Sequence, residues 1–291
     1  MDENHVGLLG AKSLVGECLL SLMTESQWQV MAFSRQTRKS EAVGIEWRSI
    51  VPLSNPHTEV GDKIEHWICV APIWVLPDYF DLLAAYGAQR VVALSSTSRF
   101  TKDDSTDLEE QATALRLADA EARVREWAES RGVEWVILRP TLIYGLGRDK
   151  NISEIIRFIR RFGFFPLFGK AKGLRQPVHA ADVAGACLAA LQAPCAANRA
   201  YNISGGETLT YRDMVGRVFT ALDRRTRLLT VPLWAFHLMV TVLRRLPRYR
   251  QWSTAMAERM SRDLVFEHKE AENDLGFSPR PFLLESQDLP E

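Results

Sequence analysis

The residues with the clearest chemical meaning form a glycine-rich turn near the start of the chain. The segment Gly10–Gly16 follows a short apolar run and precedes an apolar stretch with helical spacing. Gly10 allows the backbone to turn sharply toward a pyrophosphate, and Gly16 allows the next helix to pack closely on the strand. The amino end of that helix presents N–H groups to phosphates. The pattern predicts a dinucleotide loop that includes Gly10, Lys12, Ser13, Leu14 and Gly16.

The position of this turn strengthens the prediction, because dinucleotide loops lie between a first strand and a first helix. Ser13 stands where a middle glycine is usual. Its hydroxyl could donate to a phosphate, or its side chain could hold the loop off the ideal path. The alternative is an ordinary strand–turn–helix.

The second predicted strand ends in Ser34 and Arg35, with no acidic residue to accept from an adenosine 2′-hydroxyl. A guanidinium pairs well with a 2′-phosphate. We therefore expect Ser34 and Arg35 to bind the adenosine half of NADP(H), with NAD(H) as the alternative cofactor. Arg35 could instead be a solvated loop charge.

Short apolar runs alternate with helical patterns through the first two thirds of the chain. This alternation predicts an α/β fold, a doubly wound parallel Rossmann sheet with a small, mainly helical C-terminal lobe. We expect the Rossmann core over residues 1–149, completed by roughly 176–204, and the lobe over 150–175 and 205–291. The expected strands are His5–Leu9, Gln29–Phe33, Trp67–Ala71, Val91–Leu94, Trp135–Leu138 and Ala200–Ser204, and the expected helices are Leu14–Met23, Tyr79–Tyr86, Leu108–Arg131 and one within Val178–Leu191.

The bulk composition narrows the class of partner. The 291 residues carry 36 basic and 36 acidic side chains, and this balance gives no general attraction to nucleic acid. The four cysteines are far apart, so neither a metal site nor a disulfide framework is expected. No signal-like N-terminus and no apolar run of spanning length is evident, which favours the cytoplasm.

The chain resembles the short-chain dehydrogenase/reductase superfamily, specifically its extended and atypical branch of nucleotide-sugar epimerases and dehydratases. Segments in the matching order carry the resemblance: Gly10–Gly16, Ala71-Pro72, Arg90–Ser98, Leu138–Pro140 with Tyr144-Gly145, Gln176–Ala184 and Tyr201–Gly206. The resemblance implies that Ala71, Pro72, Ser95 and Pro140 line the cofactor. It also implies that Ser96 or Thr97 polarises a substrate oxygen, although these hydroxyls could instead cap a helix or satisfy strand-end backbone.

One feature of the family is missing. Active members carry Tyr-x-x-x-Lys on the helix before the sixth strand, but no tyrosine of this chain is followed four residues later by lysine. Alignment on Glu121 places Thr113 and Leu117 at these positions. Thr is a poor proton shuttle near neutral pH, and Leu117 cannot bond a ribose. Tyr144 is a candidate substitute acid, and the alternative is a packed tyrosine with a bonded hydroxyl.

In this family the C-terminal lobe closes over the substrate. Arg175, Arg259 and Lys170 or Lys172 could bind an anionic group such as a diphosphate, although each could be a surface charge. Residues 231–250 combine a 13-residue apolar stretch with four arginines. This segment could lie on a membrane surface, or it could be buried against the core.

Two functions follow from these residues. The first is an oxidoreductase or epimerase that acts on a nucleotide-linked or lipid-linked sugar with a non-standard acid/base. The second is a non-catalytic dinucleotide-binding protein that serves as a redox sensor or structural subunit. An enzyme should place a titratable group beside the Ser/Thr cluster, whereas a binding protein could fill that space with apolar side chains around Leu117.

Overall fold

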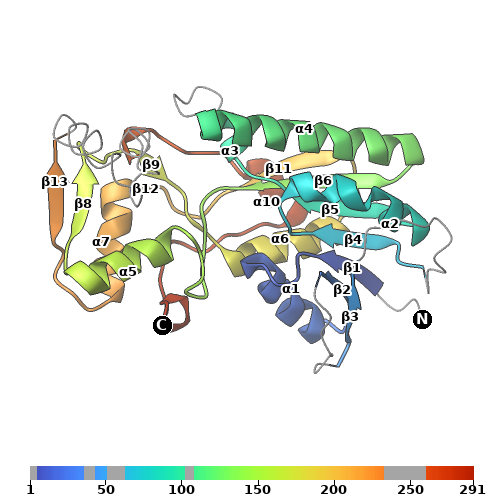
Figure 1. Cartoon of the computed structure of the whole chain (residues 1–291), viewed down its shortest axis with the longest axis horizontal. Helices are drawn as coiled ribbons and strands as arrows, with labels where there is room; N and C mark the ends of the chain where they lie inside the picture. Colours follow the sequence, from blue (N-terminus) through green and yellow to red (C-terminus); the bar gives the residue numbers. More distant parts are fainter. Residues whose placement is uncertain (1–4, 36–42, 51–62, 102–107, 233–259) are drawn as a thin grey trace.

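The computed structural model describes residues 5–35, 43–50, 63–101, 108–232 and 260–291. Its centre is a seven-stranded sheet in which every pair of neighbours is parallel (Figure 1). In spatial order the strands are β11 (Arg199–Ile203), β6 (Glu134–Pro140), β5 (Arg90–Leu94), β4 (His66–Cys69), β1 (His5–Leu9), β2 (Gln29–Ser34) and β3 (Ile45–Ser49). The predicted parallel α/β fold is confirmed.

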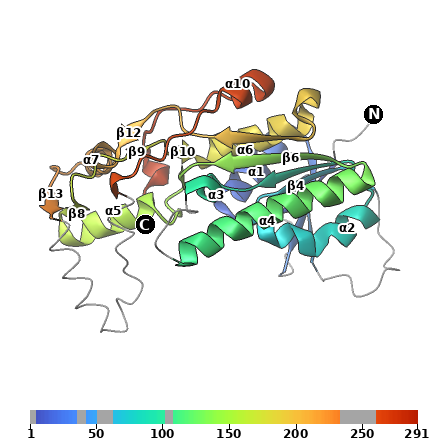
Figure 2. The same ribbon diagram turned by 90° about the horizontal axis from the view of Figure 1, so that it is seen from above.

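Helices cover both faces of this sheet. Side chains alternate between the faces, so that Val136 and Leu138 of β6 point into one core and Trp135 and Ile137 into the other. Figures 1 and 2 show α1 (Leu14–Glu25) and α6 (Ala180–Gln192) on the first face and α2 (Phe80–Ala85) and α4 (Leu108–Arg131) on the second. The 3-10 helix η1 (Ile73–Tyr79) packs into the core of the second face. Two apolar cores therefore sandwich the strands.

The strand β3 was not predicted from the sequence. Its residues are half-buried or exposed, and its sequence Ile45–Ser49 alternates apolar and polar side chains at the edge of the sheet. The expected helix Tyr79–Tyr86 also differs, because a 3-10 turn with Pro77 inside it precedes the short α2. An edge strand lacks the continuous apolar run that identifies the buried strands.

The lobe has a third apolar core, which includes Ile156, Phe219 and Phe282. Helices α5 (Ile152–Phe162) and α7 (Tyr211–Ala221) surround it, together with short strand pairs. These pairs are β7 (Ile143–Tyr144) with β10 (Val178–His179), β8 (Phe165–Phe168) with β13 (Leu228–Val231), and β9 (Leu174–Arg175) with β12 (Leu209–Thr210). Of the predicted surface segment 231–250, the residues from 233 onward lie outside the described ranges.

The remaining helical elements are short. Helix α3 (Ser98–Thr101) and the 3-10 turns η2 (Pro194–Ala196) and η4 (Ser286–Asp288) are short, and α10 (Lys269–Leu275) packs on the core beside α6. None of the helices in the described ranges has both the length and the apolar character needed to cross a bilayer.

Candidate dinucleotide and substrate cleft

The glycine loop lies where the strand order reverses, between β1 and β4. Gly10 has φ +87°, and a Cβ added there would lie 2.4 Å from the backbone nitrogen of Ala71. A Cβ on Gly16 would lie 2.4 Å from the Gly10 carbonyl oxygen. Both positions therefore require glycine, and they form a tight turn at the place where open α/β sheets bind ligands.

Ser13 is the N-cap of α1. Its Oγ accepts from the Gly16 N–H at 3.1 Å, and its own N–H donates to the Gly10 carbonyl at 2.8 Å. The hydroxyl thus stabilises the loop, while the first turn of α1 leaves N–H groups for an anion. This arrangement fits a pyrophosphate.

A cleft of about 840 Å³ extends from this loop to the lobe. Ser13 and Leu14 lie along it with Ser96 and Thr97, and Arg175 lines it on the lobe side. Its walls thus include predicted cofactor, catalytic and substrate residues. The cleft is large enough for a small-molecule ligand.

The hydroxyls after β5 have separate roles. Ser95 is buried and donates to Oε1 of Glu121 at 2.6 Å. Thr97 donates to the Pro140 carbonyl at 3.2 Å, and Ser96 Oγ accepts from a backbone N–H two residues on at 3.1 Å. Ser96 and Thr97 nevertheless line the cleft, so both remain candidates for contact with a substrate oxygen.

Glu121 is a fully buried carboxylate beneath this cluster, and its role was not predicted from the sequence. Nη2 of Arg139 donates to it at 2.6 Å, and Arg99 also forms an ion pair with it. Burial alone would raise the pKa of the Glu121 carboxyl. The hydrogen bonds from Arg139 and Ser95 and the arginine charges outweigh burial and hold this pKa below its ordinary value.

The positions aligned with the family Tyr and Lys carry no proton-transferring group. Thr113 Oγ1 donates to the Glu109 carbonyl at 2.8 Å within the same helix, and Leu117 packs in the apolar core with 3% exposure. One turn earlier on α4, Glu110 is 9% exposed and lines the cleft. Positions 110, 117 and 121 are spaced so that they share one face of a helix, and this spacing could have identified Glu110 as an inward-facing residue from the sequence.

Tyr144 does not lie among the residues that line the cleft. Its ring is fully buried against His179 and Phe282, and its hydroxyl donates to the Leu283 carbonyl at 3.1 Å. Burial raises the pKa of Tyr144 to about 12. This is the packed arrangement that the sequence left open as the alternative to an acid.

Arg175 is 4% exposed and lines the cleft. Its Nη1 donates to the carbonyls of Leu174 and Arg262 at 2.7 Å, and its guanidinium lies 5.5 Å from the Tyr211 ring centre. These contacts fix the side chain at the lobe wall. Arg259 lies outside the described residues.

The other predicted cofactor residues lie around the carboxyl ends of the strands. Ser34 ends β2 and Arg35 follows it, exposed to solvent, whereas Lys12 is half-buried in the glycine loop. Ala71 and Pro72 follow β4, and Pro140 ends β6. Apart from Ser13 and Leu14, the predicted cofactor residues are not among the residues that line the cleft.

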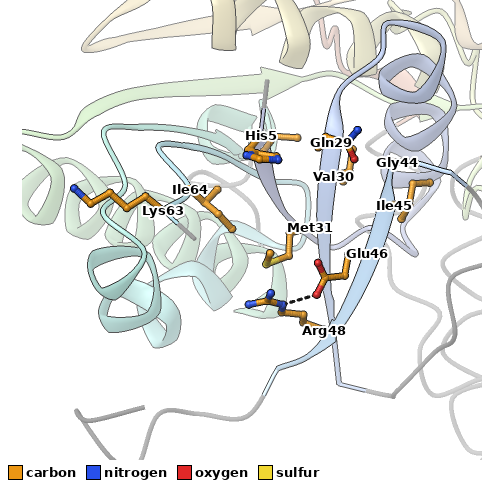
Figure 3. A pocket seen from close by; sticks show the side chains of 11 residues that line it. His5, Gln29, Val30, Met31, Gly44, Ile45, Glu46, Arg48, Lys63 and Ile64 are labelled. Atoms are coloured by element: carbon orange, nitrogen blue, oxygen red, sulfur yellow. Dashed lines mark hydrogen bonds and ion pairs between the residues drawn. The ribbon is translucent and has the colours of Figure 1, made fainter. Parts of the chain in front are cut away.

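A second pocket, of about 240 Å³, lies at the amino ends of β1, β2 and β3, away from the glycine loop (Figure 3). His5, Gln29 and Ile45, which begin β1, β2 and β3, line it. Arg48 in this pocket pairs with Glu46 and donates to the Tyr86 hydroxyl at 2.8 Å. None of the residues predicted to act on a ligand lines it.

Residues 78–204 match the family described as "NAD dependent epimerase/dehydratase family". This match covers 127 of the 291 residues, which is less than half of the chain. The matched segment contains β5 and β6, and the cleft residues Ser96, Thr97 and Glu110 lie within it. The predicted resemblance to epimerase- and dehydratase-type short-chain dehydrogenase/reductases is confirmed.

Two relatives align with this chain over parts of their length. The chain is 27% identical to a UDP-glucose 4-epimerase of Vibrio cholerae over 47% of this chain and 42% of that protein. It is 24% identical to the uncharacterized protein y4nG of Sinorhizobium fredii over 75% of this chain and 59% of that protein. In each case the alignment spans less than two thirds of the relative.

Solved epimerase structures share the fold across nearly the whole chain. A UDP-glucuronic acid 4-epimerase from Bacillus cereus in complex with NAD has a TM-score of 0.72 at 12% identity, over 98% of this chain and 95% of its own. A UDP-glucose 4-epimerase from Thermotoga maritima with UDP-glucose has a TM-score of 0.70 at 14% identity, over 94% and 93%. At sequence identities this low, the structural similarity shows the fold alone.

Proposed function

We propose that this protein binds a nicotinamide dinucleotide and acts as an epimerase- or dehydratase-like oxidoreductase on a nucleotide-linked sugar. The observation that carries the proposal is the cleft, which joins the phosphate loop at Ser13 to the hydroxyls of Ser96 and Thr97 and to Arg175. A ligand that lies along it would meet backbone N–H groups that can bind phosphates at one end and the guanidinium of Arg175 at the other. The names of the similar proteins support a sugar nucleotide as the substrate class.

The proposed cofactor is NADP(H). When bound, the nicotinamide would accept or donate the hydride. The protein would hold the phosphates at Gly10–Gly16, and Arg35 would face the adenosine 2′-phosphate. Titration of intrinsic and nucleotide fluorescence should show tighter binding of NADPH than of NADH, and Arg35→Asp should remove this preference. Equal binding of both nucleotides by the wild-type protein would contradict the NADP(H) assignment.

Proton transfer requires a substitute for the missing tyrosine, and we assign it to Glu110. Glu110 lines the cleft that Ser96 and Thr97 also line, and it lies one turn before Thr113 on the helix that carries the acid/base in the family. Its small exposed fraction, 9%, limits competition from solvent. Glu110→Gln should abolish turnover of UDP-glucose or UDP-glucuronic acid and leave NADPH affinity within about twofold.

The second candidate is a non-catalytic dinucleotide-binding protein. Leu117 favours it, because an apolar side chain replaces the lysine that would contact the nicotinamide ribose. A screen of nucleotide sugars for oxidation or reduction of bound cofactor separates the two. Tight NADPH binding with no turnover of any sugar would favour the binding protein.

A further inference from the structure

We propose that Arg148 is a pyrophosphate ligand of the dinucleotide and that Glu17 competes with the phosphates for it. This inference rests on the proposed dinucleotide site. Arg148 follows β7 in the turn that enters the lobe, whereas Glu17 lies in the first turn of α1, 131 residues away in sequence. An ion pair between them joins the lobe-side wall to the phosphate loop.

The placement of Arg148 points to the phosphates. It lines the same cleft as Ser13, Leu14 and Val15, which form the amino end of α1. A dinucleotide pyrophosphate at this helix end would therefore lie within the region that the guanidinium can reach. A planar guanidinium can bind two phosphate oxygens at once. A pyrophosphate also carries more negative charge than the single carboxylate of Glu17, so it can compete for Arg148.

The ion pair is built to be exchanged. The side chains of Arg148 and Glu17 are 53% and 40% exposed, and solvent screens the attraction of such pairs. The backbone beneath Arg148 is fixed instead. The Leu146 N–H donates to Asp288 at 3.0 Å, and Leu146 and Gly147 hold φ values of +51° and +61°. The side chain can therefore change partner while its origin stays in place.

The negative charge of Glu17 opposes the binding of phosphates at the amino end of α1. A carboxylate in the first turn of a helix is stabilised by the same N–H groups that attract a phosphate. Phosphates bound there would repel Glu17 and attract Arg148. Removal of Arg148 should therefore weaken dinucleotide binding, whereas removal of the Glu17 charge should strengthen it.

The test is fluorescence titration of NADPH into wild type, Arg148→Gln, Glu17→Gln and the control Arg157→Gln. Arg157 pairs with Glu154 on α5, is 48% exposed, and does not line the cleft. We expect Arg148→Gln to raise the Kd about tenfold and Glu17→Gln to lower it about twofold. Arg157→Gln should leave it unchanged.

ADP-ribose, as a competitor of NADPH, locates the effect. It has the pyrophosphate but neither the nicotinamide nor a 2′-phosphate, so Arg148→Gln should weaken it by the same factor as NADPH. An unchanged ADP-ribose affinity would overturn the assignment to the pyrophosphate. If Arg148→Gln and Glu17→Gln weakened NADPH binding equally, the ion pair would only stabilise the structure, and the proposed competition by Glu17 would be wrong. No binding of NADPH to the wild-type protein would overturn the cofactor proposal itself. If the wild-type protein binds NADPH and Arg148→Gln binds it equally well, only the proposal for Arg148 fails.

Discussion

The fully buried Glu121 carboxylate forms an ion pair with the partly buried Arg139 guanidinium, with Nη2 and Oε2 2.6 Å apart. Helix α4 supplies the carboxylate and strand β6 the guanidinium. Because Ser95 also donates to Glu121, the pair fixes the end of β5. It is thus part of the support on which Ser96 and Thr97 rest.

Glu121→Gln should lower the free energy of unfolding by about 3 kcal/mol, because it leaves Arg139 without its buried counter-charge. The matched control is Glu126→Gln, an exposed position of the same helix, which should change stability by less than about 0.5 kcal/mol. Urea denaturation measures both. A Glu121→Gln protein as stable as wild type would contradict the structural role of the pair.

The same pair predicts a pH dependence. The pKa of Glu121 is lower in the folded protein than its ordinary value, so the folded state binds fewer protons here than the unfolded state. Its contribution is present above the ordinary carboxyl pKa and is lost as the pH falls through the folded pKa. Between about pH 5 and pH 3, wild type should lose stability more steeply than Glu121→Gln. Parallel curves would contradict the shift.

Gly16→Ala should disrupt the phosphate loop, because the new Cβ would lie 2.4 Å from the Gly10 carbonyl oxygen. We expect a loss of about 2 kcal/mol in stability and weaker NADPH binding. Gly216→Ala on α7 is the control, since an added Cβ there meets no atom within 4 Å apart from the backbone of its own helix. That change should stabilise the protein by about 0.5 kcal/mol.

Tyr144→Phe separates the two interpretations of this tyrosine. It removes the hydrogen bond to the Leu283 carbonyl and should cost about 1 kcal/mol of stability. NADPH affinity and any sugar turnover should stay within twofold of wild type, roughly the scatter of such measurements. A loss of turnover at full stability would restore Tyr144 as the acid.

Asp288→Ala should loosen the C-terminal strap, which we define as residues 282–291. Asp288 accepts from Nε2 of His179 at 3.1 Å and from the Leu146 N–H at 3.0 Å. Burial would raise its pKa, but these hydrogen bonds and that from the Glu285 N–H hold the pKa below its ordinary value. The variant should exchange its amide hydrogens faster at 144–148 and 282–291, whereas exposed Gln287→Ala should not.

The sheet could be predicted from the sequence because its central strands are buried on both faces. Val91–Leu94 and Trp135–Leu138 read as continuous apolar runs, and both lie within the strands of the structure. The half-exposed β3 and the two-residue strands of the lobe have no such signature. The lobe pairs therefore could not be found in this way.

The cleft was predictable only where a local motif defines it. The loop Gly10–Gly16 carries its own signature, so its position followed directly from the sequence. The pairs Glu121–Arg139 and Glu17–Arg148 join residues 18 and 131 positions apart. Their charges resemble solvated surface charges until tertiary packing brings them together, and the inward direction of Tyr144 is set in the same way.

The strap makes the cleft depend on the most distant part of the chain. The bonds from Tyr144 to Leu283 and from Leu146 to Asp288 span 139 and 142 residues, and the same turn carries Arg148. By thermodynamic reciprocity, a ligand that stabilises this turn must stabilise the strap against opening to the same extent. Cleavage of the strap by an added protease should therefore slow as the cleft fills, and its rate becomes a gauge of occupancy that requires no knowledge of the reaction.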